Sequence, residues 1–218
     1  MNSIAIFCGS KAGNDTIFVH TAQQVGEKIA RQGKTLVYGG GRSGLMGVVA
    51  DSALQAGGKV IGVIPEALVD RELAHPNLTE LYVVKNMHER KTKMSELADG
   101  FIALPGGAGT LEEIFEQWTW AQLGIHLKPC AFLNVSGFYD ALLSMIDMTV
   151  RQGFTHSRFA DTLLVSDQIE ILLEFIRSKR IVPALQSWEN PWPKVGAKAE
   201  RTDEESFRRR RFPHGQQL

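Results

Sequence analysis

Short apolar runs alternate along the chain with longer segments in which apolar residues recur every three or four positions. The runs are rich in β-branched residues and indicate strands, whereas the longer segments have the period of amphipathic helices. Strands are expected at 4–9, 35–40, 59–64, 80–85, 100–105, 129–134 and 162–166, and helices at 15–32, 44–57, 87–98, 110–123, 137–152 and 167–178. This alternation predicts an α/β fold with a doubly wound, mainly parallel sheet of about seven strands and helices on both faces.

The alternating pattern stops after Arg180. Residues 181–218 hold four of the eight prolines and two of the four tryptophans, and they show no sustained apolar period. We therefore predict one globular domain at residues 1–180, long enough to bury a sizeable core, and an irregular C-terminal tail at 181–218.

Charge and cysteine content narrow the expected partners and location. Lys plus Arg and Asp plus Glu both number 24, so no net field favours nucleic acid or an anionic membrane, and a small molecule is the expected partner. Cys8 and Cys130 form neither a disulfide framework nor a metal-ligand spacing, so we expect no metal and a reducing, cytoplasmic location. The sequence starts without a basic leader, and no window approaches the ~18 apolar residues of a membrane span.

Glycine-rich loops follow three of the expected strands, with CGSKAG at 8–13, GGGRSGLMG at 39–47 and PGGAGT at 105–110. In a doubly wound sheet such loops share the edge at which ligands bind. The last two lead into helices, whose free N–H groups and positive dipole ends stabilise phosphate. Ordinary turn chemistry is the alternative explanation of such glycines. The candidate contacts for a nucleotide phosphate are Gly9, Ser10, Gly40, Gly41, Gly107, Ala108, Gly109 and Thr110.

The second loop also has the G-x-G-x-x-G spacing of dinucleotide-binding proteins, at Gly39, Gly41 and Gly44. That motif normally follows the first strand, and an acidic residue ends the next strand. Here the loop follows the second strand, and the nearest acid, Glu66, comes after a proline. A nicotinamide dehydrogenase is therefore a strained alternative. A P-loop is disfavoured further, because Gly44 is followed by apolar residues instead of Lys and Ser or Thr.

The segment MHERK, residues 87–91, opens a helix at the same predicted edge. Arg90 offers a bidentate fork for phosphate or carboxylate, and Lys91 offers a point charge. The alternative is an ordinary solvated helix in which Glu89 and Lys93 form an i,i+4 pair.

The stretch LPGGAGTLEEIFE, residues 104–116, places two adjacent acids directly after an anion-binding loop. Thr110 at the helix N-cap and Glu113 three residues later have the spacing of a capping box, which explains Glu113 without any function. A catalytic carboxylate that faces the crevice is the other interpretation. Adjacent helical positions differ by about 100° in direction, so at most one of Glu112 and Glu113 can serve the crevice.

Taken together, MHERK, PGGAGTLEE, GGGRSGLMG and WTWAQLGIHLKP resemble the LONELY GUY family of cytokinin riboside 5′-monophosphate phosphoribohydrolases, often mislabelled as lysine decarboxylases. The likeness spans about residues 2–178. It implies a Rossmann-like catalytic domain and a homodimer. The implied reaction is hydrolysis of the N-glycosidic bond of N6-modified adenosine monophosphates, which releases free base and ribose 5-phosphate.

The motifs carry the family's functional residues onto this sequence one by one. The resemblance implies a catalytic arginine at Arg90 and a catalytic glutamate at Glu113. Implied nucleotide contacts are Glu72, Lys91, Gly107, Ala108, Gly109, Thr110, Leu111, Glu112 and Thr119. Preference for AMP or another base would depend on Met87 and the loop at 66–78. Nothing resembles a pyridoxal-phosphate lysine site, so we expect no cofactor and no decarboxylation. The alternative is a non-catalytic nucleotide or molybdenum-cofactor carrier of the same fold. Such a carrier would bind through the same glycines but would not need Glu113.

Overall fold

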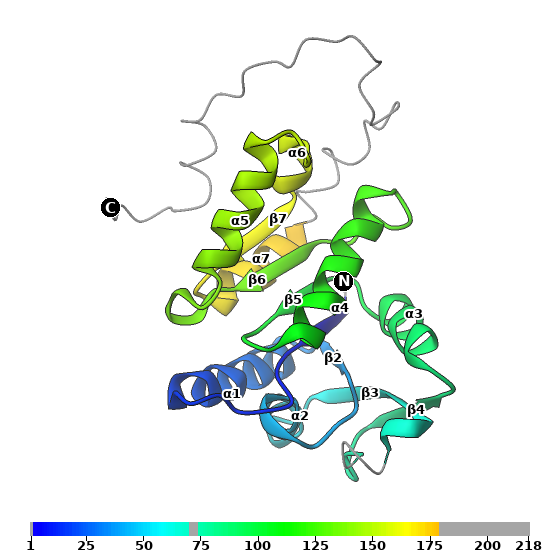
Figure 1. Ribbon diagram of the computed structural model, residues 1–218. Helices are drawn as coiled ribbons and strands as arrows, with labels where there is room; N and C mark the ends of the chain where they lie inside the picture. Colours follow the sequence, from blue (N-terminus) through cyan, green and yellow to red (C-terminus); the bar gives the residue numbers. More distant parts are fainter. Residues whose placement is uncertain (1, 70–73, 179–218) are drawn as a thin grey trace.

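The computed structural model describes residues 2–69 and 74–178, which form a sheet flanked by helices (Figure 1). The strands are β1 (Ser3–Phe7), β2 (Thr35–Tyr38), β3 (Lys59–Pro65), β4 (Glu80–Val84), β5 (Phe101–Ala103), β6 (Cys130–Leu133) and β7 (Leu163–Ser166). The α-helices are α1 (Thr16–Arg31), α2 (Gly44–Gln55), α3 (Met87–Leu97), α4 (Ala108–Gln122), α5 (Asp140–Arg151), α6 (Ser157–Ala160) and α7 (Ile169–Ser178). Two short 3₁₀ helices are η1 (Glu66–Leu68) and η2 (Val135–Gly137).

Every strand pair in the described sheet is parallel, and the spatial order is β4-β3-β2-β1-β5-β6-β7. The chain runs outward from β1 to β4 and then returns to β5 on the other side of β1. The order therefore reverses between β1 and β5, the position where open α/β sheets bind ligands. The predicted doubly wound, parallel sheet of about seven strands is confirmed.

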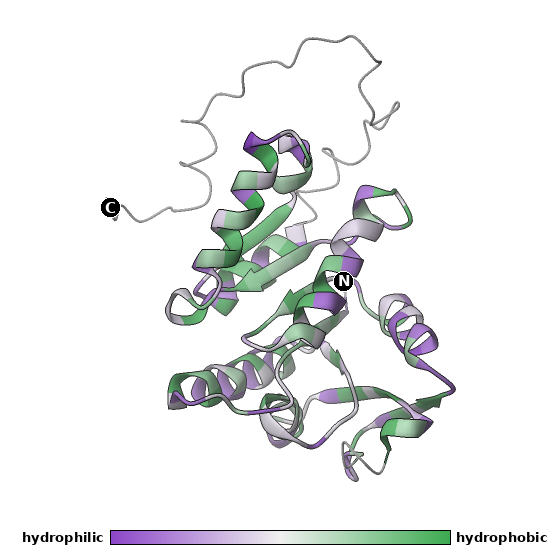
Figure 2. Cartoon of the chain, viewed as in Figure 1, coloured by the Kyte–Doolittle hydropathy of each residue, from purple (hydrophilic) through white to green (hydrophobic). Residues whose placement is uncertain are grey.

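The sheet separates two hydrophobic layers. Because strand side chains alternate between faces, Ile4 and Ile6 of β1 pack into one layer with α1, α2 and α7. Ala5 and Phe7 pack into the other layer, with α3, α4 and α5. Figure 2 shows the same arrangement, with hydrophobic strands at the centre and hydrophilic positions on the outer helix surfaces. None of the helices within residues 2–69 and 74–178 combines the length and apolar character needed to cross a lipid bilayer.

One predicted boundary is wrong in a way that matters for the site. Helix α4 begins at Ala108 with Gly107 as N-cap, so Thr110 is the third residue of the helix and not its cap. The predicted capping box between Thr110 and Glu113 is therefore absent from α4. The short helix α6 was not predicted, because four residues are too few to show a helical period. The predicted tail at 181–218 lies outside the described residues, and the domain boundary near residue 180 stays a prediction.

Candidate functional site

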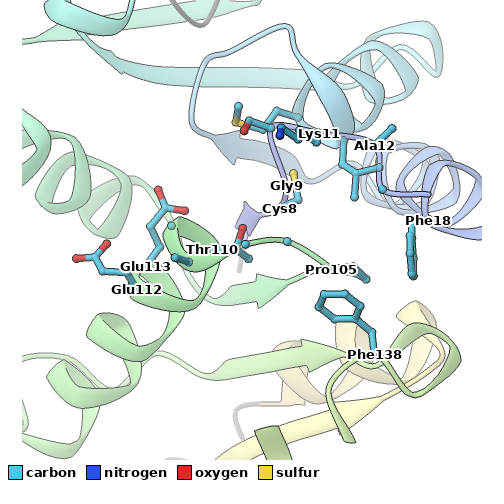
Figure 3. A pocket seen from close by; sticks show the side chains of 18 of the residues that line it. Cys8, Gly9, Lys11, Ala12, Phe18, Pro105, Thr110, Glu112, Glu113 and Phe138 are labelled. Carbon is cyan, nitrogen blue, oxygen red and sulfur yellow. The ribbon is translucent and has the colours of Figure 1, made fainter. Parts of the chain in front are cut away.

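A cavity of about 620 Å³ opens at the carboxyl ends of β1 and β5, where the strand order reverses. Its walls come from the loops after these two strands, the first turns of α2 and α4, one face of α3, and two aromatic residues, Phe18 in α1 and Phe138 just before α5. Figure 3 shows Glu112 and Glu113 at one end and Phe18 and Phe138 near each other at the other end. The lining residues are Cys8, Gly9, Ser10, Lys11, Ala12, Gly13, Phe18, Leu45, Met46, Leu68, Met87, Arg90, Pro105, Gly106, Gly107, Ala108, Gly109, Thr110, Glu112, Glu113 and Phe138.

The first turn of α4 forms one wall of this cavity. A Cβ atom placed on Gly107 or Gly109 would meet no atom within 4 Å, so the backbone there is open to the cavity. The first amides of an α-helix have no intrahelical acceptors, and they carry the positive end of the helix dipole. This turn can therefore bind a phosphate group through backbone N–H groups.

Close packing fixes the loop that precedes α4. Gly9 donates a backbone hydrogen bond to Pro105 at 3.1 Å, which ties the loop after β1 to the loop after β5. A Cβ on Gly106 would lie 2.7 Å from Cβ of the buried Thr110 and 2.9 Å from N of Gly9. Only glycine therefore fits at position 106, and its absence of a side chain lets the two loops and the Thr110 side chain meet.

Arg90 and Glu113 come from different helices and lie together in the cavity wall. Arg90 Nη2 is 4.0 Å from Glu113 Oε1, and the two side chains are only 6% and 12% exposed. Arg90 Nη2 also donates a hydrogen bond to the Gly39 carbonyl at 3.2 Å, so the residue that follows β2 orients the guanidinium. A Cβ on Gly39 would lie 2.0 Å from Arg90 Nη2, so any side chain at position 39 would displace the guanidinium. The pair combines a permanent positive charge with a carboxylate that is largely shielded from water.

The Glu113 carboxylate lies near Arg90 and is close enough to Cys8 to act on its thiol. Burial raises the pKa of the Cys8 thiol, and the negative charge of Glu113 raises this pKa further. Cys8 therefore stays protonated and neutral beside the Glu113 carboxylate. The cavity-facing interpretation of Glu113 agrees with this geometry, whereas the capping interpretation does not.

Lys91 of α3 contacts two carboxylates of α4. Its Nζ donates hydrogen bonds to Glu112 Oε1 at 2.6 Å and to Glu116 Oε1 at 2.9 Å. Burial by itself lowers the pKa of Lys91, but the bonds and charges of Glu112 and Glu116 outweigh burial, and the net pKa is raised. Lys91 is therefore a bound ammonium ion that joins α3 to α4.

The second glycine loop differs from the expectation that it faces the crevice through a free helix end. At the start of α2, the Leu45 amide donates to the Gly9 carbonyl at 3.0 Å, so the protein itself occupies this donor. Gly44 has φ +57° and lies against the backbone of Ser10, an approach that a Cβ would prevent. The Gly40 carbonyl accepts a hydrogen bond from the His75 amide at 3.0 Å. This loop packs the site together, and α4 supplies the helix end that is open.

The structure brings together most of the predicted site residues. Those that line the cavity are Gly9, Ser10, Met87, Arg90, Gly107, Ala108, Gly109, Thr110, Glu112 and Glu113. Among the described residues, those that lie outside the lining are Gly40, Gly41, Lys91, Leu111 and Thr119. Glu72 lies outside the described residues. Phe18 and Phe138 line the cavity but were not predicted, because neither belongs to a glycine loop or a charged motif.

The fold is that of a Rossmann-like protein, with a cavity and the open first turn of α4 at the switch point of the sheet. The family model described as "Possible lysine decarboxylase" matches residues 46–176. The chain is 44% identical over 190 residues to a probable cytokinin riboside 5′-monophosphate phosphoribohydrolase of Oryza sativa subsp. japonica, and the match covers 85% of each. It is 48% identical over 177 residues to the cytokinin riboside 5′-monophosphate phosphoribohydrolase of Rhodococcoides fascians, covering 81% of this chain and 89% of that protein.

The chain therefore belongs to the LONELY GUY family, and the resemblance seen in the motifs is confirmed. Among solved structures, the molybdenum cofactor carrier protein of Chlamydomonas reinhardtii superposes with a TM-score of 0.60 at 20% identity. That match covers 82% of this chain and 97% of the carrier, and at this level of identity it shows the shared fold alone.

Proposed function

We propose that this chain is a nucleoside 5′-monophosphate phosphoribohydrolase. It hydrolyses the N-glycosidic bond of N6-modified adenosine 5′-monophosphates and releases the free cytokinin or adenine base and ribose 5-phosphate. The names of the relatives support this activity. The single observation that carries it in the structure is the placement of Glu113 beside Arg90 in a cavity that also contains the open first turn of α4.

The two ends of the substrate need different chemistry. The 5′-phosphate is an anion, and the backbone amides of Ala108, Gly109 and Thr110 are donors suited to it. Binding energy from this remote group can position the ribose for reaction. The sugar would then extend from the first turn of α4 toward Glu113, which lies one turn further along the same helix.

Cleavage develops positive charge on the sugar ring. Water adds its oxygen to C1′ as the C1′–N bond breaks, and the electron pair of that bond leaves with the base, which gains a proton. Glu113 is assigned to stabilise the oxocarbenium-like transition state and to take a proton from the attacking water. A guanidinium group keeps its positive charge in proteins and is a poor proton donor, so the role assigned to Arg90 is to hold the ribose or phosphate and to orient Glu113.

A product assay tests the activity directly. Purified protein is incubated with isopentenyladenosine 5′-monophosphate, with AMP, with the two parent nucleosides and with lysine, and products are separated by chromatography. We expect free base and ribose 5-phosphate from the monophosphates, little release from the nucleosides, and no cadaverine from lysine. A carrier would bind the monophosphates and release no base, and that outcome would reject the hydrolase.

We also propose that the protein forms a homodimer. Leu123, Ile125 and Leu127, which follow α4, are 61%, 63% and 39% exposed, and such apolar surface favours a partner. Thr119 is exposed on the same helix, so a second copy could approach it. Light scattering should give twice the mass of one chain, and Leu123→Ser with Ile125→Ser should shift the mass toward one chain. A single-chain mass in the wild-type protein would contradict the dimer.

A cytoplasmic, reducing location is proposed from the cysteines. Cys8 and Cys130 are both free and buried. Alkylation of rapidly quenched cells followed by mass spectrometry should find both thiols reduced, and a disulfide at either would contradict this location.

A further inference from the structure

Three carboxylates project from neighbouring positions of α4 close to the proposed phosphate site. Glu112 and Glu113 line the cavity, and Glu116 lies one turn after Glu112 on the same face of the helix. An i,i+4 pair of like charges destabilises a helix, and negative charge beside an anion site opposes phosphate binding. The site therefore needs a positive charge on this face of α4.

Lys91 supplies that charge from α3. Its side chain is only 9% exposed, whereas the Glu112 side chain that it contacts is 52% exposed. The ammonium group bridges Glu112 and Glu116 at 2.6 Å and 2.9 Å, but Lys91 itself does not line the cavity as described. Its contacts are made with the carboxylates of α4, on the side of the helix that faces α3.

We propose that Lys91 is a positioning residue that acts through Glu112. Its ammonium group holds the Glu112 carboxylate toward α3 and neutralises it, so that the first turn of α4 favours a phosphorylated ribose over an unphosphorylated one. This assignment rests on the proposed function. It differs from a direct contact between Lys91 and the nucleotide, which the sequence motif implies.

The test measures the binding of ribose 5-phosphate and ribose by calorimetry, and kcat and KM with isopentenyladenosine 5′-monophosphate. The Lys91→Met variant should bind ribose 5-phosphate about tenfold more weakly and should raise KM more than it lowers kcat. The Lys91→Arg variant, which keeps the charge, should retain most of the affinity. Lys93→Met is the matched control, because Lys93 lies on the same helix and pairs with Glu96 at 3.7 Å on the surface. It should leave both measurements unchanged.

A second substitution distinguishes an indirect role of Lys91 through Glu112 from a direct contact with the phosphate. If Lys91 acts through Glu112, then Lys91→Met combined with Glu112→Gln should return ribose 5-phosphate affinity to within about threefold of the wild type. If Lys91 contacts the phosphate directly, the double variant should stay as weak as Lys91→Met, and the proposal is overturned. Wild-type affinity in Lys91→Met would also overturn it.

Variants without the acidic pair keep the test valid if Lys91→Met does not fold. In a Glu112→Gln, Glu116→Gln background, adding Lys91→Met should leave ribose 5-phosphate affinity unchanged. A further loss of affinity there would refute the proposal. Failure of the proposed function would look different, because the wild-type protein itself would then release no base, whether or not it binds ribose 5-phosphate.

Discussion

Gly39→Ala displaces the Arg90 guanidinium without changing any charge. Gly39 directly follows β2, and its backbone conformation is one that alanine can adopt, since its φ lies outside the left-handed region. The added Cβ would lie 2.0 Å from Arg90 Nη2 and 3.1 Å from Cζ, whereas real Cβ atoms essentially never approach another atom within 3.0 Å. The guanidinium must therefore move by about 1 Å, away from the Gly39 carbonyl.

A displacement of about 1 Å can reduce the rate of an enzyme about 100-fold. We therefore expect Gly39→Ala to lower kcat/KM for isopentenyladenosine 5′-monophosphate by about two orders of magnitude. Overpacking should also lower the free energy of unfolding by about 1–3 kcal/mol. Because most of the population stays folded at that cost, the loss of activity should greatly exceed the loss of folded protein.

The assay compares initial rates of base release with urea unfolding curves. Gly100→Ala is the control, because its Cβ would lie 2.9 Å from Ile176 Cγ2 at the amino end of β5, opposite the cavity. This control should lose stability but keep its rate within about threefold of the wild type. If Gly39→Ala and Gly100→Ala lose activity equally, the loss is caused by reduced stability. The displacement of Arg90 would then not explain the loss of activity in Gly39→Ala.

Two further predictions concern titratable groups. Burial, together with the Lys128 charge, lowers the pKa of His126 from 6.5 to about 4. The unfolded state therefore binds more protons between these values, and stability that is present above pH 6.5 should fall by about 1–3 kcal/mol toward pH 4, after allowance for the partial exposure of the ring. Urea unfolding at pH 7 and pH 4.5 measures this effect, and between these pH values the free energy of unfolding should fall less in His126→Gln than in the wild type. Equal decreases would show that His126 is not the cause. Because burial raises the pKa of Cys8, iodoacetamide at pH 8 should leave the folded protein unmodified at Cys8, and rapid alkylation would contradict this.

The sheet could be predicted from the sequence because its apolar runs are buried on both faces. Runs such as IAIF at 4–7 and CAFL at 130–133 have no polar position, which is typical of central parallel strands. The start of α4 could not be placed as well. Thr110 and Glu113 have capping-box spacing, but glycines at 107 and 109 let the helix start earlier, and Thr110 is buried against Gly106 instead.

The proposed site was predicted where one motif carries several contacts. Gly107, Ala108 and Gly109 follow one another at the start of α4 and line the cavity together. The sequence could not show which of the two glycine-rich helix starts is open. The difference depends on a backbone hydrogen bond from Leu45 to Gly9, which are 36 positions apart, and only the folded chain forms it. The aromatic residues Phe18 and Phe138 were missed for the same reason, since tertiary packing alone brings them to the cavity.

Glu113→Gln tests the central claim most directly, because it removes the charge of the carboxylate and keeps its size. Binding of AMP, measured by calorimetry, should stay within about threefold of the wild type, since the proposed phosphate contacts are backbone amides of α4. Base release from isopentenyladenosine 5′-monophosphate should fall by at least about 100-fold, as expected when transition-state stabilisation is lost. Release at the wild-type rate would show that Glu113 is not the catalytic carboxylate.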